Sequence, residues 1–404
     1  MSYTADLHLH SRYAYATSKN ITLERLAAWA RVKGIDLLSS ADFTHPVWRR
    51  ELEDKLVPVS PGLYRFGGVS FVLGTEVSCV YKQGGRSRRV HMLLFAPGFA
   101  TVDRLRAAFS DAGAKLESDG RPTLRMSARD LTALALDIDP QCMVIPAHVW
   151  TPWFGLFGSK SGFDHLEECF LDMAPQIHAI ETGLSSDPAM NWNIQGLGDR
   201  SIVSFSDAHS APKLGRELTV FDGDLGYGEL ADALRHRRVA YSVEFYPEEG
   251  KYHHSGHRKC GVSHSPEDTA RIGQRCPVCN RPLTLGVLHR ISGLSDGEES
   301  SHRDAGGFVQ NQEGFPPFIR LVPLIEVIAE TMGLGPASKW VEREYSRIIG
   351  ELESELNVLA WAGEADLVTV AGETLARNIL KARVGEVMVE PGYDGLYGKV
   401  SVGG

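Results

Sequence analysis

Histidines and carboxylates recur in this sequence directly after short apolar segments, and these are residue types that bind divalent metal ions. His8 and His10 close the first apolar segment. On an extended strand, residues two apart project to the same side, so both imidazoles can face one ion. Asp207 and His209 repeat this spacing after the apolar segment at 202–206. The candidate ligands are His8, His10, Asp42, His45, Glu76, His91, His148, Asp207 and His209.

Each of these residues also has an ordinary structural interpretation when it is taken alone. A single His-x-His pair is often solvated, and an isolated His91 or His148 is more often a hydrogen-bonded core histidine. The recurrence of such residues in order after successive apolar segments is poorly explained in that way. The sequence therefore favours a site for two or three divalent ions, Zn²⁺, Mn²⁺ or Mg²⁺, with Glu76 able to bridge two of them.

A second group of ligands lies farther along the chain. Cys276 and Cys279 flank a Pro-Val dipeptide, a spacing that presents two thiolates to one zinc ion, and His257 and Cys260 have the same spacing. We predict a structural zinc site formed by His257, Cys260, Cys276 and Cys279. The fourth ligand stays open, with His253, His254 and His264 as competitors of His257. A redox Cys-x-x-Cys pair is the alternative, but a thioredoxin-like context is lacking.

The elements that must position the first group of ligands follow an alternating pattern. From residue 5 to about 245, short apolar runs alternate with amphipathic stretches, which is typical of a βα sheet or barrel. Active sites of βα barrels lie at the carboxyl ends of the strands. Strands are predicted at 5–9, 35–38, 69–73, 90–95, 143–147, 177–181 and 202–206, and helices at 22–33, 101–112, 127–137 and 227–238. These six or seven units predict an α/β barrel near the TIM class.

The pattern changes near residue 246, and a chain of 404 residues exceeds what one hydrophobic core usually organises. We predict a barrel over 1–245, a zinc-binding module over 246–291, a polar, glycine-rich linker over 292–318 and a mainly helical C-terminal domain over 319–404. Within that last domain, helices are predicted at 323–332, 337–360 and 373–383, followed by two short β runs between 386 and 400.

The net charge of −9 argues against non-specific binding of nucleic acid, which rests on neutralising phosphates. Carboxylates that hold divalent ions nevertheless count as negative in this total. The candidate basic contacts for DNA are Arg86, Arg88, Arg89, Arg258 and Lys259. The longest apolar runs are strand-sized, well below the roughly 18 residues of a membrane helix. Because the N-terminus also lacks a basic and apolar leader, we expect a cytoplasmic protein with no membrane contact.

The order of the candidate ligands resembles the polymerase and histidinol phosphatase (PHP) superfamily over residues 1–245. The resemblance is carried by Asp6-Leu-His-Leu-His-Ser11, Asp42 with His45, Glu76, His91, His148 and Asp207-Ala-His209. It implies a distorted (β/α)7 TIM-like barrel that hydrolyses phosphoesters with a multinuclear metal site. It also implies three ligand sets: His8, His10, Glu76 and Asp207; Glu76, His91 and His148; and His45 or Asp42 with His209.

Further motifs are similar to the endonuclease Q family over nearly the whole chain. They are Ala41-Asp-Phe-Thr-His-Pro46, Ser206-Asp-Ala-His-Ser210, Gly256-His-Arg-Lys-Cys260, Cys276-Pro-Val-Cys279 and Pro391-Gly-Tyr-Asp-Gly395. This resemblance implies a nuclease that cuts DNA on the 5′ side of uracil, hypoxanthine, xanthine and abasic sites. The residues expected to carry the reaction are Asp207, Glu76, His8 and His10.

Damaged DNA is then the expected partner, and a sliding clamp is left open as a protein partner. Two other functions remain as alternatives. The first is a PHP-type phosphatase that acts on a small phosphate monoester, although the zinc-binding module and the C-terminal domain would then be unexplained. The second is a DNA-binding accessory protein without catalysis, although a decayed site would be expected to have lost several of its ligands.

Overall fold

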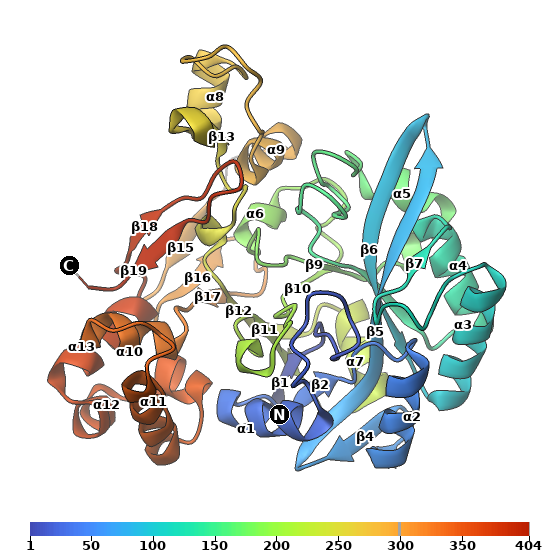
Figure 1. Cartoon of the computed structure of the whole chain (residues 1–404), viewed down its shortest axis with the longest axis horizontal. Coiled ribbons are helices and arrows are strands. Elements are labelled where there is room, and N and C mark those ends of the chain that lie inside the picture. The colour runs from blue at the N-terminus through green and yellow to red at the C-terminus, as the bar shows by residue number, and fades with distance from the viewer. Residues whose placement is uncertain (298–299, 404) are drawn as a thin grey trace.

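The computed structural model describes residues 1–297 and 300–403, and the first half of the chain forms a barrel from which the longer strands at Val69–Gln83 and Arg86–Ala96 project (Figure 1). The barrel strands are β1 (Ser2–Asp6), β2 (Leu37–Ser39), β5 (Val69–Gln83), β6 (Arg86–Ala96), β8 (Met143–Pro146), β9 (Ala179–Glu181) and β10 (Ser201–Val203). β1, β2 and β5 pair in parallel, as do β9 and β10. β6 runs antiparallel to both of its neighbours, β5 and β8.

Backbone hydrogen bonds beyond the strand ends close the barrel. Val149 N donates to the carbonyl oxygen of Glu181 at 3.0 Å, which joins the end of β8 to β9. His10 N donates to the carbonyl oxygen of Ala208 at 3.0 Å, which joins the end of β1 to the segment after β10. The distorted seven-stranded barrel implied by the resemblance is therefore confirmed.

Helices and short strands surround the barrel. The first helix begins at Leu23 because the Thr22 side chain accepts a hydrogen bond from Arg25 N, and it ends at Gly34, whose φ of +83° suits glycine. The helices are α1 (Leu23–Lys33), α2 (Pro46–Lys55), α3 (Phe99–Asp111), α4 (Ala128–Ile138), α5 (Leu166–Phe170), α6 (Ala189–Trp192) and α7 (Tyr227–Arg235). The added strands are β3 (Val57–Ser60), β4 (Leu63–Phe66) and β7 (Thr123–Leu124).

A sheet extension leads from the barrel to the second half of the chain. β11 (Leu218–Asp222) pairs antiparallel with β1, and β12 (Val239–Glu244) pairs antiparallel with β11. The next strand in this sheet is β17 (Phe318–Arg320), parallel to β12, followed by β16 (Phe308–Asn311) and β15 (Ser301–Arg303). Residues from distant parts of the sequence thus form one continuous sheet.

This extension corrects the linker predicted over 292–318. Of that range, 298–299 lie outside the described residues, and much of the rest forms the tail of α9 (Val287–Leu294) and the strands β15 and β16. The polar, glycine-rich composition belongs to the turn of a hairpin. There, the Asp304 side chain accepts hydrogen bonds from Gly306 N and Phe308 N. Apolar runs of two residues were too short to reveal strands in the sequence.

The remaining elements build the zinc-binding module and the helical C-terminal region. The module contains β13 (Ser255–His257), β14 (Val262–His264), α8 (Pro266–Ile272) and α9. The C-terminal region contains α10 (Leu324–Met332), α11 (Lys339–Leu352), α12 (Glu364–Ala371), α13 (Glu373–Arg383), β18 (Met388–Glu390) and β19 (Lys399–Ser401). Single turns of 3-10 helix lie at Ala211–Lys213, Pro247–Glu249 and Arg258–Cys260, with a longer one at Leu171–Gln176. Across the described residues, none of the helices is both long and apolar enough to cross a membrane.

The single helix predicted over 337–360 is instead two segments. α11 ends at Leu352, Glu353 adopts a φ of +68°, and a π-helical segment follows at Asn357–Trp361. The break turns the buried Glu355 carboxylate toward the barrel, where it forms an ion pair with Lys33 at the end of α1. Glu355 also accepts hydrogen bonds from Leu324 N and the Tyr345 hydroxyl. This contact fixes the helical region against α1, beside which it lies in Figure 1.

We expect Lys33→Met to lower the free energy of unfolding by about 3 kcal/mol, because removing one partner leaves a buried charge without its counterion. The measurement is a urea unfolding titration. The double variant Lys33→Met/Glu355→Gln should recover most of the loss, because glutamine is neutral and still accepts from Leu324 N. A single variant as stable as the wild type would contradict the importance of this pair.

Candidate metal centre

Three groups of buried or partly buried donors meet at the carboxyl end of the barrel, and in each group the donor atoms lie within 4.8 Å of one another. The groups share Glu76 or His10. They consist of His8, His10 and Glu76; of Glu76, His91 and His148; and of His10, Asp207 and His209. We call these seven residues the metal centre. Strand polarity explains how His91 joins it. β6 is antiparallel, so the first half of β6 lies beside the carboxyl half of β5, and His91 shares a face of the sheet with Glu76.

The side chains of the metal centre fit divalent ions because several of their buried polar atoms lack a hydrogen-bond partner among the described residues. Among the described residues, His8 Nε2, His10 Nε2 and Asp207 Oδ1 are buried without a hydrogen-bond partner. His8 Nε2 and His10 Nε2 lie 3.5 Å and 3.2 Å from Asp207 Oδ1. Unpartnered buried polar atoms are costly, and a shared cation would satisfy all three.

Neighbouring side chains fix the orientation of the histidine rings. The ring nitrogen Nδ1 of His8 hydrogen bonds to Glu181 at 2.8 Å, and Nδ1 of His148 hydrogen bonds to Thr151 Oγ1 at 2.9 Å. In both residues this leaves Nε2 directed at Glu76. A carboxylate or hydroxyl on the far ring nitrogen is the usual arrangement behind a metal-binding histidine.

Burial and facing charges set the protonation of the centre. Burial lowers the pKa of His8, but the carboxylates of Glu181, Asp207 and Glu76 outweigh it and raise that pKa well above its usual value. Burial would raise the pKa of Glu76, but the facing side chains of His91, Arg121 and His8 hold that pKa well below its usual value. Burial lowers the pKa of His91 to about 4, and the nearby Glu76 carboxylate opposes this shift. A proton on His8 thus supplies charge that a bound cation would replace.

The backbone is strained where it delivers these ligands. Asp42, His148 and Asp207 follow barrel strands and have φ values of +35°, +30° and +46°, in a region that non-glycine residues rarely adopt. Such conformations persist where surrounding contacts enforce them, and they cluster at functional sites. Gly183 leaves room for one of them, because a Cβ atom there would lie 2.3 Å from His148 Cβ.

Two predicted ligands, Asp42 and His45, lie outside the three donor groups. Asp42 Oδ1 is 3.3 Å from His10 Nδ1, and Asp42 Oδ2 accepts from Ser11 N at 2.6 Å, so this carboxylate acts behind His10. The His45 ring stacks on Tyr13 with 4.2 Å between ring centroids. The third donor group therefore joins His209 to His10 and Asp207 instead of to Asp42 or His45.

Sequence reasoning did not assign two residues that contact the metal centre. Glu181 bonds to the ring of His8 and accepts from His148 N at 2.7 Å. Its position at the end of a predicted strand was a signal that could have identified it. Arg121 Nη1 lies 3.0 Å from Glu76 Oε2 and comes from the loop before β7, where nothing in the sequence marks it.

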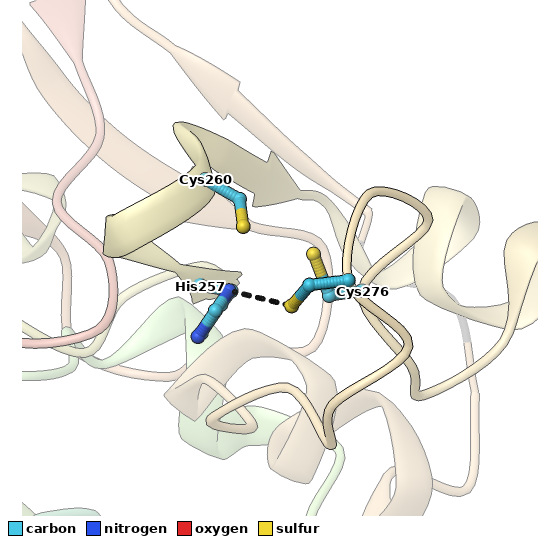
Figure 2. Close-up of side chains that lie close together, drawn as sticks. His257, Cys260 and Cys276 are labelled. Carbon is cyan, nitrogen blue, oxygen red and sulfur yellow. Dashed lines mark hydrogen bonds between the residues drawn. The ribbon is translucent and has the colours of Figure 1, made fainter.

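The second candidate site lies in the zinc-binding module. His257, Cys260, Cys276 and Cys279 place their donor atoms within 4.8 Å of one another, and Figure 2 shows the labelled side chains converging. His253, His254 and His264, the competing candidates, are not members of this group. Burial opposes ionisation of Cys276, but the backbone N–H groups of Cys279 and Val278 lower its thiol pKa to about 6. The thiolate, which is the form that binds zinc, is thus favoured at neutral pH.

The candidate DNA contacts divide between two projections of the molecule. Arg86 and Arg89 are exposed on the β5–β6 hairpin, and Arg258 and Lys259 are exposed in the zinc-binding module. Arg88 differs, because its guanidinium donates to the Gly162 carbonyl oxygen and lies over the Phe163 ring, 4.0 Å from the centroid. That arginine fastens the hairpin to the loop after β8.

Solved structures of other proteins resemble this chain over nearly its whole length. The lesion-specific endonuclease PfuEndoQ from Pyrococcus furiosus superposes with a TM-score of 0.87 and is 30% identical, over 99% of this chain and 95% of that one. A structure of endonuclease Q with a 27-mer duplex substrate, which carries an abasic lesion at the active site, gives a TM-score of 0.86 at 30% identity, over 100% and 97% of the two chains.

Two further similarities concern shorter stretches. The family described as the MJ0043 C-terminal domain matches residues 323–386. The uncharacterized protein MJ0043 of Methanocaldococcus jannaschii is 31% identical over 260 residues, which are 62% of this chain. The matched part is 31% of the length of MJ0043, so the chain corresponds to about a third of that protein.

A PHP-type barrel that gathers buried histidines and carboxylates at one end defines a metal-dependent hydrolase. The similarity to PfuEndoQ extends beyond the barrel through the zinc-binding module and the helical region. The chain belongs to the endonuclease Q family.

We expect Gly183→Ala to weaken the binding of divalent ions at the metal centre by about 10- to 100-fold, because the new methyl group would displace His148. The measurement is isothermal titration with Mn²⁺. Gly113→Ala is the matched control, since its φ of +84° imposes similar strain but a Cβ atom there meets no atom within 4 Å. Equal affinity in the two variants would contradict a ligand role for His148.

We expect Cys276→Ser to lose one equivalent of zinc, because a hydroxyl does not replace the thiolate as a ligand. The measurement is zinc content by mass spectrometry after dialysis. Cys142→Ala is the control, since this buried thiol lies outside the four-residue group. Full zinc content in Cys276→Ser would rule out the proposed site.

Proposed function

We propose that this protein is a DNA repair endonuclease that hydrolyses the phosphodiester bond on the 5′ side of uracil, hypoxanthine, xanthine and abasic sites. Its membership of the endonuclease Q family supports this reaction. The observation that carries the proposal is the convergence of three atoms, His8 Nε2, His10 Nε2 and Asp207 Oδ1, which are unpartnered among the described residues. They lie beside the shared carboxylate of Glu76 at the open end of the barrel.

Two to three divalent ions held by the metal centre would lower the pKa of a water molecule and stabilise the departing 3′ oxygen. The donors combine imidazole with carboxylate, a mixture that suits Zn²⁺ or Mn²⁺ better than Mg²⁺. We propose that the module ligands His257, Cys260, Cys276 and Cys279 hold a separate, structural Zn²⁺.

The chain's own residues orient the reacting groups. Glu181 holds the ring of His8 and Asp42 holds the ring of His10, so both Nε2 atoms face one point. The Asp207 side chain is 26% exposed, whereas the Glu76 side chain is fully buried. Asp207 is therefore the carboxylate that substrate can reach, and it is placed to accept a proton from the attacking water.

Basic residues on the two projections would bind the DNA backbone. In Figure 1 the β5–β6 hairpin and the zinc-binding module extend at the same end of the molecule. Arg86 and Arg89 on the hairpin and Arg258 and Lys259 in the module are exposed there. Because the whole chain is acidic, with a net charge of −9, phosphate binding would be confined to this face and would weaken steeply with salt. A sliding clamp remains a second candidate partner, and we assign no binding surface to it.

The test uses a labelled duplex with one deoxyuridine or deoxyinosine, in the presence of Mn²⁺ or Mg²⁺. We expect the wild type to nick immediately 5′ to the lesion and to spare undamaged DNA. We expect Asp207→Asn to nick about 100- to 10,000-fold more slowly, because it loses a ligand and a proton acceptor. Asp111→Asn, at an exposed position at the end of α3, is the matched control and should keep wild-type activity.

Two outcomes would contradict the proposal. Release of phosphate from small monoesters without nicking would indicate a PHP-type phosphatase. Binding of lesion DNA without hydrolysis of either substrate would indicate an accessory protein.

A further inference from the structure

The side chain of Arg121, which is positively charged, lies against the candidate metal centre. Arg121 Nη1 lies 3.0 Å from Glu76 Oε2, and the Arg121 side chain is 23% exposed. Among the described residues, no other arginine or lysine forms an ion pair with Glu76 or Asp207. A guanidinium beside divalent ions is repelled unless an anion lies between them.

The loop that carries Arg121 is held on both sides. Asp119 Oδ1 accepts from Tyr15 N and from Arg121 N, each at 3.1 Å. The Gly120 carbonyl oxygen accepts from Thr44 Oγ1 at 3.0 Å, and a Cβ atom at Gly120 would lie 2.4 Å from Asp42 Oδ2. The backbone before Arg121 therefore packs against Asp42, the carboxylate behind His10, and the Arg121 side chain extends from there to Glu76.

Both oxygens of Glu76 are also required by the donor groups. Oε1 lies 2.6 Å from His91 Nδ1 and 3.2 Å from His148 Nε2, while Oε2 lies 3.2 Å from His10 Nε2. Ions held by these groups would draw on both oxygens of Glu76, and Arg121 would then lose its carboxylate partner. A guanidinium presents a fork of N–H donors that matches two oxygens of a phosphate group.

We propose that Arg121 binds the non-bridging oxygens of the scissile phosphodiester, on the side of the metal centre that faces substrate. This inference rests on the proposed phosphodiester hydrolysis. It identifies Arg121 as a residue that touches the reacting group, in addition to the metal ligands. The inference also gives a reason for the position of Arg121. The carboxylates of the centre could be neutralised by metal ions alone, so a guanidinium held beside them by its loop calls for a further anion.

The test compares Arg121→Met and Arg121→Lys with the wild type. Arg125→Met is the matched control, an exposed arginine four residues along the same chain segment. We expect Arg121→Met to keep wild-type metal content and thermal stability, to bind inorganic phosphate about tenfold more weakly when loaded with Mn²⁺, and to nick lesion DNA about 100- to 1,000-fold more slowly. Arg121→Lys should recover part of both losses, and Arg125→Met should match the wild type.

Two results would overturn the inference. Wild-type phosphate binding and nicking in Arg121→Met would show that the guanidinium does not contact the phosphate. Loss of metal in step with activity would show that Arg121 only holds Glu76 in place. Failure of the wild type to nick any lesion DNA would instead refute the proposed function, and the phosphate titration would still report on Arg121.

Discussion

The buried carboxylate of Glu76 is the constraint around which the metal centre is built. A charge that is removed from water is tolerated only when opposite charges and hydrogen-bond donors surround it. Four histidines and one arginine converge on Glu76, and they come from the segment after β1, from β6 and from the loops around β7 and β8: His8, His10, His91, His148 and Arg121. Side chains from several parts of the barrel therefore surround the Glu76 carboxylate. Divalent ions would replace the positive charge that these side chains supply to it.

Rigid backbone geometry supports this arrangement. Three loops after barrel strands hold non-glycine residues at positive φ, and Gly183 leaves room for one of them, His148. A flexible loop would lower this strain and lose the position of the ligand. A non-glycine residue at positive φ also positions a buried side chain in the second half of the chain. There the backbone turns at Glu353 and places the Glu355 carboxylate against Lys33.

The predicted zinc-binding module is held by the end of the chain. Asp394, in the turn between β18 and β19, accepts hydrogen bonds from Arg258 N at 2.7 Å and from Thr284 Oγ1 at 2.6 Å. Arg258 adjoins the candidate ligand His257. The C-terminal hairpin therefore holds the backbone directly beside the candidate zinc ligands.

The sequence by itself determined which residues are candidates for the chemistry and roughly where they lie. Ligand type, spacing of two on a strand and position after an apolar run are local properties, and they marked His8, His10, Glu76 and Asp207, as well as the candidate zinc ligands, all of which the structure gathers into compact donor groups. Tertiary structure decided that Asp42 acts behind His10, that Glu181 and Arg121 join the centre, and that residues 301–320 form strands. Those features depend on contacts between segments that are far apart in the sequence. A local sequence pattern does not show which distant segments will meet.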